Sequence, residues 1–155
     1  MSAKTFIKEL ISQQEHSSLE FKIGWNVEAI LKTICAFLNT EGGWIIIGHN
    51  EKEVIGLPNI SEQIVIELKQ NALENIFPQP LVYVQLETVD EKSIVLLNVL
   101  KGSRQPYSYQ KKYFIRKNGQ SIEASPDDVS LILRSSNQYT SSWEKLTTVD
   151  AKYND

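Results

Sequence analysis

The chain has 155 residues, 41% of them hydrophobic, which is enough for one domain with a core that needs no metal or disulfide. Its 16 basic and 19 acidic residues give a formal charge of −3, which excludes a uniformly basic nucleic-acid-binding protein and a disordered chain. The single cysteine, Cys35, excludes an intramolecular disulfide and a zinc site built on several thiolates. Neither a membrane-spanning apolar run nor a signal-peptide pattern is present, so we expect a soluble cytoplasmic protein.

The first half of the chain predicts alternating helices and strands. From the spacing of apolar side chains we expect helices over 3–14 and 28–38 and strands over 19–22, 44–47 and 54–57. The run 44–47 is apolar throughout, which is typical of a strand buried on both faces, with 54–57 as its hairpin partner. Gly42 and Gly43 end the second helix, because glycine adopts backbone conformations closed to most residues.

The second half predicts two hairpins between two further helices. We expect strands over 81–88, 93–100, 112–116 and 120–123, with a loop over 101–110. Asn59 is the predicted cap of a helix that ends near residue 76, because Glu62 three residues later completes a capping box. Asn118-Gly119 is a strong hairpin signal, and Ser125-Pro126 predicts the start of a last helix that ends near Asn137.

These elements predict an α+β fold, with a mixed sheet and hairpins packed against helices. The domain is expected to span residues 1–137, and residues 138–155 to form a polar C-terminal tail.

Basic residues are concentrated in one part of the chain. Between Glu91 and Glu123 there is no acidic residue, but there are seven basic ones: Lys92, Lys101, Arg104, Lys111, Lys112, Arg116 and Lys117. Four aromatic residues lie among them: Tyr107, Tyr109, Tyr113 and Phe114. Lysine and arginine attract phosphates and aromatic rings stack on unpaired bases, so the stretch predicts a nucleic-acid-binding surface. The alternative is an ordinary solvated strand pair with half-buried tyrosines.

Two glutamates precede and enter the first predicted strand. Glu20 and Lys22 should share its solvent face, with Glu15 close by, and carboxylates near a lysine can hold Mg²⁺ or Mn²⁺ against a phosphate. The alternative is that both glutamates are ordinary surface charges. Cys35 falls on an apolar helix face, so a nucleophile–base pair with His49 is not expected. No Gly-Lys-Ser/Thr follows the glycines, so this motif gives no support for ATP binding.

Four segments together resemble one known family. EHSSLEFK at 15–22 resembles the E-x4-E-F-K opening of the Schlafen AlbA-type domain (AlbA_2, also called divergent AAA-4). AFLNTEGGWIIIG at 36–48 resembles its helix end and following strand, and VIG at 54–56 its next strand. PY at 106–107 and YFIRKNG at 113–119 resemble its ending.

The resemblance implies nucleic-acid handling. Bacterial proteins with this domain are described as DNA- or RNA-binding proteins, often as predicted transcriptional regulators, and some carry an ATP-binding label. Vertebrate relatives include endoribonucleases with three acidic residues, two of which correspond to Glu15 and Glu20. The third is an aspartate at a place that reads His49-Asn50-Glu51 here, so Glu51 would have to replace it. Those relatives grip RNA with two such halves, which implies a homodimer here.

Our preferred interpretation is a nucleic-acid-binding domain, for DNA or RNA, of the transcriptional-regulator type, with no membrane association. Its predicted contacts are Lys22, Lys101, Arg104, Tyr109, Lys111, Lys112, Arg116 and Lys117. The first alternative is an endoribonuclease in which Glu15, Glu20 and Glu51 are catalytic and hold Mg²⁺ or Mn²⁺. The second is a non-catalytic regulatory or dimerisation domain.

Overall fold

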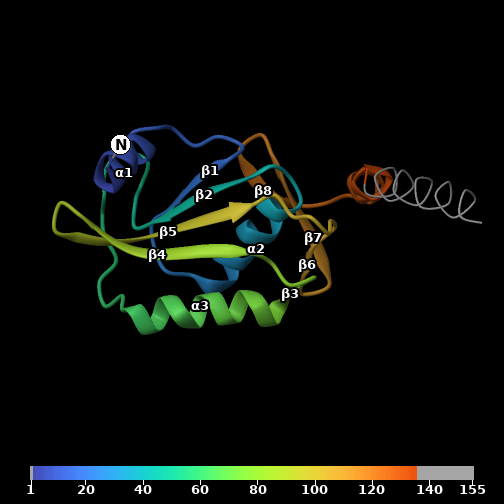
Figure 1. Cartoon of the computed structure of the whole chain (residues 1–155). Helices are drawn as coiled ribbons and strands as arrows, with labels where there is room; N and C mark the ends of the chain where they lie inside the picture. The colour runs from blue at the N-terminus through green and yellow to red at the C-terminus, as the bar shows by residue number, and fades with distance from the viewer. Residues whose placement is uncertain (1, 136–155) are drawn as a thin grey trace, which may run out of the picture.

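The computed structural model describes residues 2–135, which form two small sheets around a central helix (Figure 1). The helices are α1 (Ala3–Ile11), α2 (Val27–Leu38) and α3 (Glu62–Asn75), and residues 126–135 are also helical. The strands are β1 (Leu19–Lys22), β2 (Gly42–Ile47), β3 (Ile76–Phe77), β4 (Val82–Val89), β5 (Lys92–Leu100), β6 (Ser108–Tyr109), β7 (Lys112–Lys117) and β8 (Gln120–Glu123). The α+β class predicted from the sequence is confirmed.

The first sheet has the strand order β1-β2-β5-β4, and the second has the order β3-β6-β7-β8. β1 and β2 are parallel and joined through α2, which makes one βαβ unit, whereas the other pairings are antiparallel. The prediction that residues 54–57 pair with β2 as a strand is wrong. β5 occupies that side of β2, and only an isolated bridge joins His49 to Val54.

α2 is enclosed between the two sheets. Its apolar residues pack on one side against β2, β4 and β5, and on the other against Tyr107, Tyr109 and Phe114 of the second sheet. This explains why the helix is apolar almost all round: from Ile30 to Leu38 only Lys32 escapes burial. α3 runs alongside β4 at the edge of the first sheet (Figure 1).

β2 is buried on both faces, as its apolar run predicted. Ile45 and Ile47 belong to the core that α2 covers, whereas Ile46 belongs to a second core beneath α1. The α1 residues buried in this second core are Ile7 and Leu10, and Ile11 packs against it. Burial of both faces favours a continuous apolar strand over an alternating one.

The start of α3 differs from the prediction. Ser61 caps the helix, because its Oγ accepts a hydrogen bond from the Ile64 N–H at 3.3 Å, and Glu62 is the first helical residue. Asn59 lies before the helix with a φ of 64°, so it cannot close a capping box with Glu62. The hairpin predicted at Asn118-Gly119 is confirmed between β7 and β8.

The helix at residues 126–135 starts where the sequence predicts. The Ser125 Oγ accepts a hydrogen bond from the Asp128 N–H, and an Asp128 carboxylate oxygen accepts one from the Ser125 N–H in return. The predicted end near Asn137 and the tail over 138–155 lie outside the described residues. Among residues 2–135 no helix combines the length and the apolar character that crossing a membrane demands.

Candidate functional site

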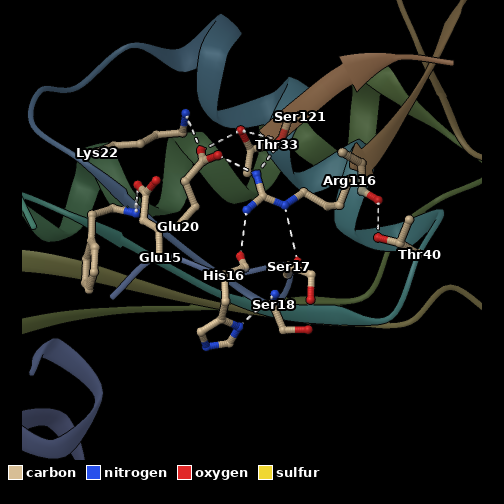
Figure 2. Close-up of polar contacts among 12 residues, drawn as sticks. Glu15, His16, Ser17, Ser18, Glu20, Lys22, Thr33, Thr40, Arg116 and Ser121 are labelled. Carbon is tan, nitrogen blue, oxygen red and sulfur yellow. Dashed lines mark hydrogen bonds and ion pairs between the residues drawn. The ribbon is translucent and has the colours of Figure 1, made fainter. Parts of the chain in front are cut away.

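Glu20 lies on β1 and points toward α2 and β7 rather than into solvent. Its Oε1 accepts a hydrogen bond from Arg116 at 2.5 Å, and its Oε2 accepts from Lys22 at 2.7 Å and from the Thr33 hydroxyl at 2.9 Å (Figure 2). Its side chain is 12% exposed and that of Lys22 18%. The prediction that Glu20 and Lys22 lie on a solvent-exposed face of β1 is therefore wrong, because β1 is covered on both sides.

Arg116 is an interior residue. Its side chain is 1% exposed and its guanidinium lies 4.7 Å from the centre of the Phe37 ring. Besides Glu20, its nitrogens donate to the backbone oxygens of His16 and Ser17 and to the Ser121 hydroxyl (Figure 2). The predicted role of Arg116 as a phosphate contact is not supported, because the guanidinium is buried and makes four hydrogen bonds within the chain.

The Glu20 carboxylate is held in its charged form. Burial alone would raise its pKa, but the positive charges of Lys22 and Arg116 and the Thr33 hydrogen bond outweigh burial and lower the pKa. The group thus serves as the anionic centre of an ion-pair network that ties β1, α2 and β7 together.

Glu15 and Glu51 meet although they are distant in sequence. Glu15 accepts a hydrogen bond from the Phe21 N–H at 2.9 Å. Burial raises the pKa of Glu15; this N–H opposes the rise, whereas the Glu51 and Glu20 carboxyls add to it. The backbone of Glu51 contacts His49, because the His49 Nδ1 accepts a hydrogen bond from the Glu51 N–H at 2.9 Å.

His49 is buried and stacks on Phe21, with ring centres 4.3 Å apart. Burial lowers the pKa of His49, and the Glu51 charge opposes that shift only in part. Because Nδ1 accepts a hydrogen bond, the neutral ring carries its proton on Nε2.

The three predicted ligands do not form a metal-binding set. Within residues 2–135 no three acidic, histidine or cysteine side chains converge closely enough to hold an ion. Both oxygens of Glu20 are occupied by Lys22, Thr33 and Arg116, which leaves only Glu15 and Glu51 facing each other. The residues present therefore do not fit the Mg²⁺ or Mn²⁺ site, and catalytic roles for Glu15, Glu20 and Glu51 stay predictions.

The raised pKa of Glu15 gives a stability prediction. A carboxyl whose pKa is higher in the folded than in the unfolded chain lowers stability at neutral pH, and this loss disappears as the pH falls through the folded pKa. We expect Glu51→Gln, which removes one repulsive charge, to raise the free energy of unfolding at pH 7 by only a fraction of about 1 kcal/mol, because solvent screens the repulsion at this partly exposed pair. The gain should vanish in acid. Urea denaturation at several pH values measures it, and Glu53→Gln, an exposed neighbour, is the control.

Asn39 is the residue whose importance the sequence does not reveal. The sequence places it only at a helix end, but its buried amide joins α2 to the second sheet. Its Nδ2 donates to the backbone oxygens of Tyr107 at 2.8 Å and Phe114 at 2.9 Å, and its Oδ1 accepts from the Tyr107 N–H at 2.6 Å. Cys35 donates to the same Tyr107 oxygen, and burial raises the pKa of its thiol to about 12, which is consistent with a core residue and not a nucleophile.

The glycine pair after Asn39 allows close packing of backbones at the start of β2. A Cβ on Gly42 would lie 2.4 Å from the Val99 oxygen, and one on Gly43 would lie 2.2 Å from the Ser18 oxygen. The two glycines therefore allow β2 to lie close to β1 and β5. Their role is structural, and they do not form a phosphate-binding loop.

The basic stretch is divided between interior and surface. Tyr107, Tyr109 and Phe114 are buried against α2, so the predicted stacking of Tyr109 on bases is not supported. Five predicted cationic contacts are exposed: Lys101, Arg104, Lys111, Lys112 and Lys117. Three of them lie near an acidic partner, in the pairs Lys101–Glu41, Lys112–Glu123 and Lys117–Asp128, at 3.5 to 3.8 Å.

A hollow of about 410 Å³ lies beside this surface. Lys101, Gln105 and Arg116 line it together with Thr40 and with Leu131 of the last helix. The hollow is open to solvent, and the exposed Lys101 lines it together with Thr40, which follows the end of α2.

The fold and this network define a small α+β domain in which a helix lies between two sheets and a buried Glu–Arg pair links them. The chain belongs to the Schlafen AlbA_2 family, whose model matches residues 15–125. The family predicted from the sequence motifs is therefore confirmed.

Two solved structures share this fold. The DIP2311 protein from Corynebacterium diphtheriae superimposes with a TM-score of 0.59 at 18% identity, over 78% of this chain but only 26% of that one. The N-terminal domain of a protein from Nitrosomonas europaea, described as related to the ATP-dependent DNA helicase RecG, gives 0.53 at 18% identity. That match covers 81% of this chain and 94% of the other. This chain thus corresponds to a small part of DIP2311 and to nearly all of the second domain.

Proposed function

We propose that this domain binds nucleic acid through the exposed cations of the second sheet and its entry loop. The observation that carries the proposal is the set of five exposed basic side chains at Lys101, Arg104, Lys111, Lys112 and Lys117. Membership of the Schlafen AlbA_2 family supports it, as does the likeness to the N-terminal domain of a protein described as helicase-related.

The ion pairs on this surface do not prevent phosphate binding. Lys112 and Glu123 are both 58% exposed, and Lys101 and Lys117 are 55% and 57% exposed. Exposed pairs of this kind contribute only about 0–1 kcal/mol, so a phosphate can replace the carboxylate partner. Arg104 and Lys111 have no side-chain partner among the described residues.

The binding we propose is of backbone and shape rather than of base sequence in a duplex. The five exposed cations that carry the proposal lie on strands and loops, so no helix among the described residues brings them into a duplex groove. A regulatory role in transcription and pairing of two copies are further parts of this proposal, supported by the family alone. Sedimentation of the purified chain with and without nucleic acid tests whether two copies pair.

We expect the triple variant Lys111→Gln, Lys112→Gln, Lys117→Gln to bind a fluorescent oligonucleotide at least about tenfold more weakly at low salt. The plot of log affinity against log salt should become shallower, by about 0.7 for each single-strand phosphate that the variant no longer neutralises. Fluorescence anisotropy over a salt series measures both quantities.

The matched control replaces three other lysines with glutamine: Lys8, Lys52 and Lys69, which are exposed and lie outside this surface. It has the same net charge as the test variant. Equal weakening by both triple variants would show that overall charge, and not this surface, determines binding. Unchanged affinity in the test variant would refute the proposal.

A further inference from the structure

One face of the first sheet is only half covered. α1 packs over the end where β4 and β5 join, and its first turns lie against the segment 87–90 (Figure 1). At the opposite end of the same face Tyr83 and Leu100 are 50% and 45% exposed.

Three side chains cross this open face in one row. Trp44 on β2 is the register partner of Asn98 on β5, and Asn98 is the register partner of Tyr83 on β4. Directly paired residues of neighbouring strands point to the same face, and strands lie about 4.8 Å apart, so the two rings are about two strand widths apart with the amide between them. Phe6 of α1 contacts Trp44, with ring centres 5.2 Å apart, and fixes the tryptophan at the covered end of the row.

The amide in this row is free. Asn98 is half-buried, and its side chain has no hydrogen bond or other polar partner among residues 2–135. The Tyr83 hydroxyl likewise has none within the same range. A central strand normally carries apolar residues at such a position, and an amide there between two rings offers both donor and acceptor to a ligand.

We propose that the row Trp44–Asn98–Tyr83 binds the unpaired bases of a single-stranded nucleic acid. This inference rests on the proposed nucleic-acid-binding function and names the form of nucleic acid and the surface that takes its bases. Tyr83 and the exposed part of Trp44 provide faces on which bases stack, and the Asn98 amide hydrogen-bonds a base edge. Lys101, next to Leu100 at the open end of the face, attracts the phosphate backbone.

The chemistry favours bases over a protein partner. Stacking needs exposed rings and works for any base, because each base has a π-face, whereas an apolar protein contact would leave the Asn98 amide buried without a partner. The bases of a duplex are already stacked and paired, so a duplex cannot use this row.

The test compares Tyr83→Ala with the wild-type chain, using a fluorescent ten-nucleotide oligo(U) and a duplex RNA of the same length. We expect Tyr83→Ala to weaken binding of the single strand between about 5-fold and 100-fold and to leave duplex binding unchanged. Tyr83→Phe should bind the single strand as the wild type does, because the ring remains. Ile66→Ala is the control, since Ile66 is an exposed apolar side chain on α3, outside both proposed binding surfaces.

Each outcome decides between the two proposals. If the wild type binds oligo(U) and Tyr83→Ala binds it equally well, the base-binding row is refuted and the proposed function stands. If the wild type binds neither these RNAs nor the corresponding DNAs at low salt, both proposals fail. A shift of the sedimentation coefficient in Tyr83→Ala with unchanged RNA affinity would assign this face to contact between protein chains, and would also overturn the inference.

Discussion

Replacing Arg116 with methionine should lower the free energy of unfolding by about 3–5 kcal/mol, because it leaves the Glu20 carboxylate in the interior with one positive partner removed. The guanidinium donates to Glu20 at 2.5 Å and also satisfies the backbone oxygens of His16 and Ser17. Methionine keeps much of the side-chain volume against Phe37. The expected loss is therefore electrostatic and hydrogen-bonding in origin rather than a packing defect.

Urea denaturation measures this loss, and Lys117→Met is the matched control on the same strand. Lys117 is 57% exposed and pairs with Asp128 only at the surface, so its replacement should change stability by less than about 1 kcal/mol. The double variant Arg116→Met, Glu20→Gln should be more stable than Arg116→Met alone, because it removes the unpaired charge. If Arg116→Met and Lys117→Met lose equal stability, the Glu20–Arg116 pair is not the link between the sheets.

The pH dependence of the same variant has a definite sign. In the wild type the lowered pKa of Glu20 adds stability above the ordinary glutamate pKa, and this contribution is lost as the pH falls through the folded pKa. Without Arg116 the Glu20 carboxyl protonates at a higher pH. The stability difference between wild type and Arg116→Met should therefore narrow steadily in acid.

Local sequence patterns predict most elements because the signals that carry them are local. The apolar run of β2, the hairpin at Asn118-Gly119 and the Ser125 cap each depend on a few neighbouring residues. The predicted start of α3 is misplaced because Asn59 and Ser61 are both acceptable caps. The positive φ of Asn59, which the sequence does not show, decides between them.

The candidate site is harder to predict, because charge and residue type do not say which face of a strand is buried. The sequence predicts Arg116 at the surface with Lys112 and Lys117, yet β7 packs against α2 and turns Arg116 toward Glu20. Tyr109 is similarly expected to meet bases but completes the core around α2. These errors share one cause: local patterns predict the β7–β8 hairpin but not that a second sheet covers the far side of α2.

Replacing Asn39 with alanine should lower the free energy of unfolding by about 3 kcal/mol or more, because three buried backbone groups each lose a hydrogen bond at once. These groups are the N–H and oxygen of Tyr107 and the oxygen of Phe114. Asn39 is 4% exposed, so water cannot readily replace the amide. Asn98→Ala, which removes an amide that has no partner among the described residues, should change stability by less than about 1 kcal/mol.

Asn39→Asp separates the loss of hydrogen bonds from the loss of volume. Aspartate has the shape of asparagine, but its carboxylate would face the Tyr107 and Phe114 oxygens, which the amide nitrogen now contacts. Burial beside two carbonyl oxygens should raise the pKa of the new carboxyl, so the variant should gain stability relative to wild type as the pH falls. Stability is thus expected to be lowest for Asn39→Asp at neutral pH and to approach that of Asn39→Ala in acid. Urea denaturation at pH 7 and pH 4 tests this order, and a pH-independent difference between the two variants would contradict it.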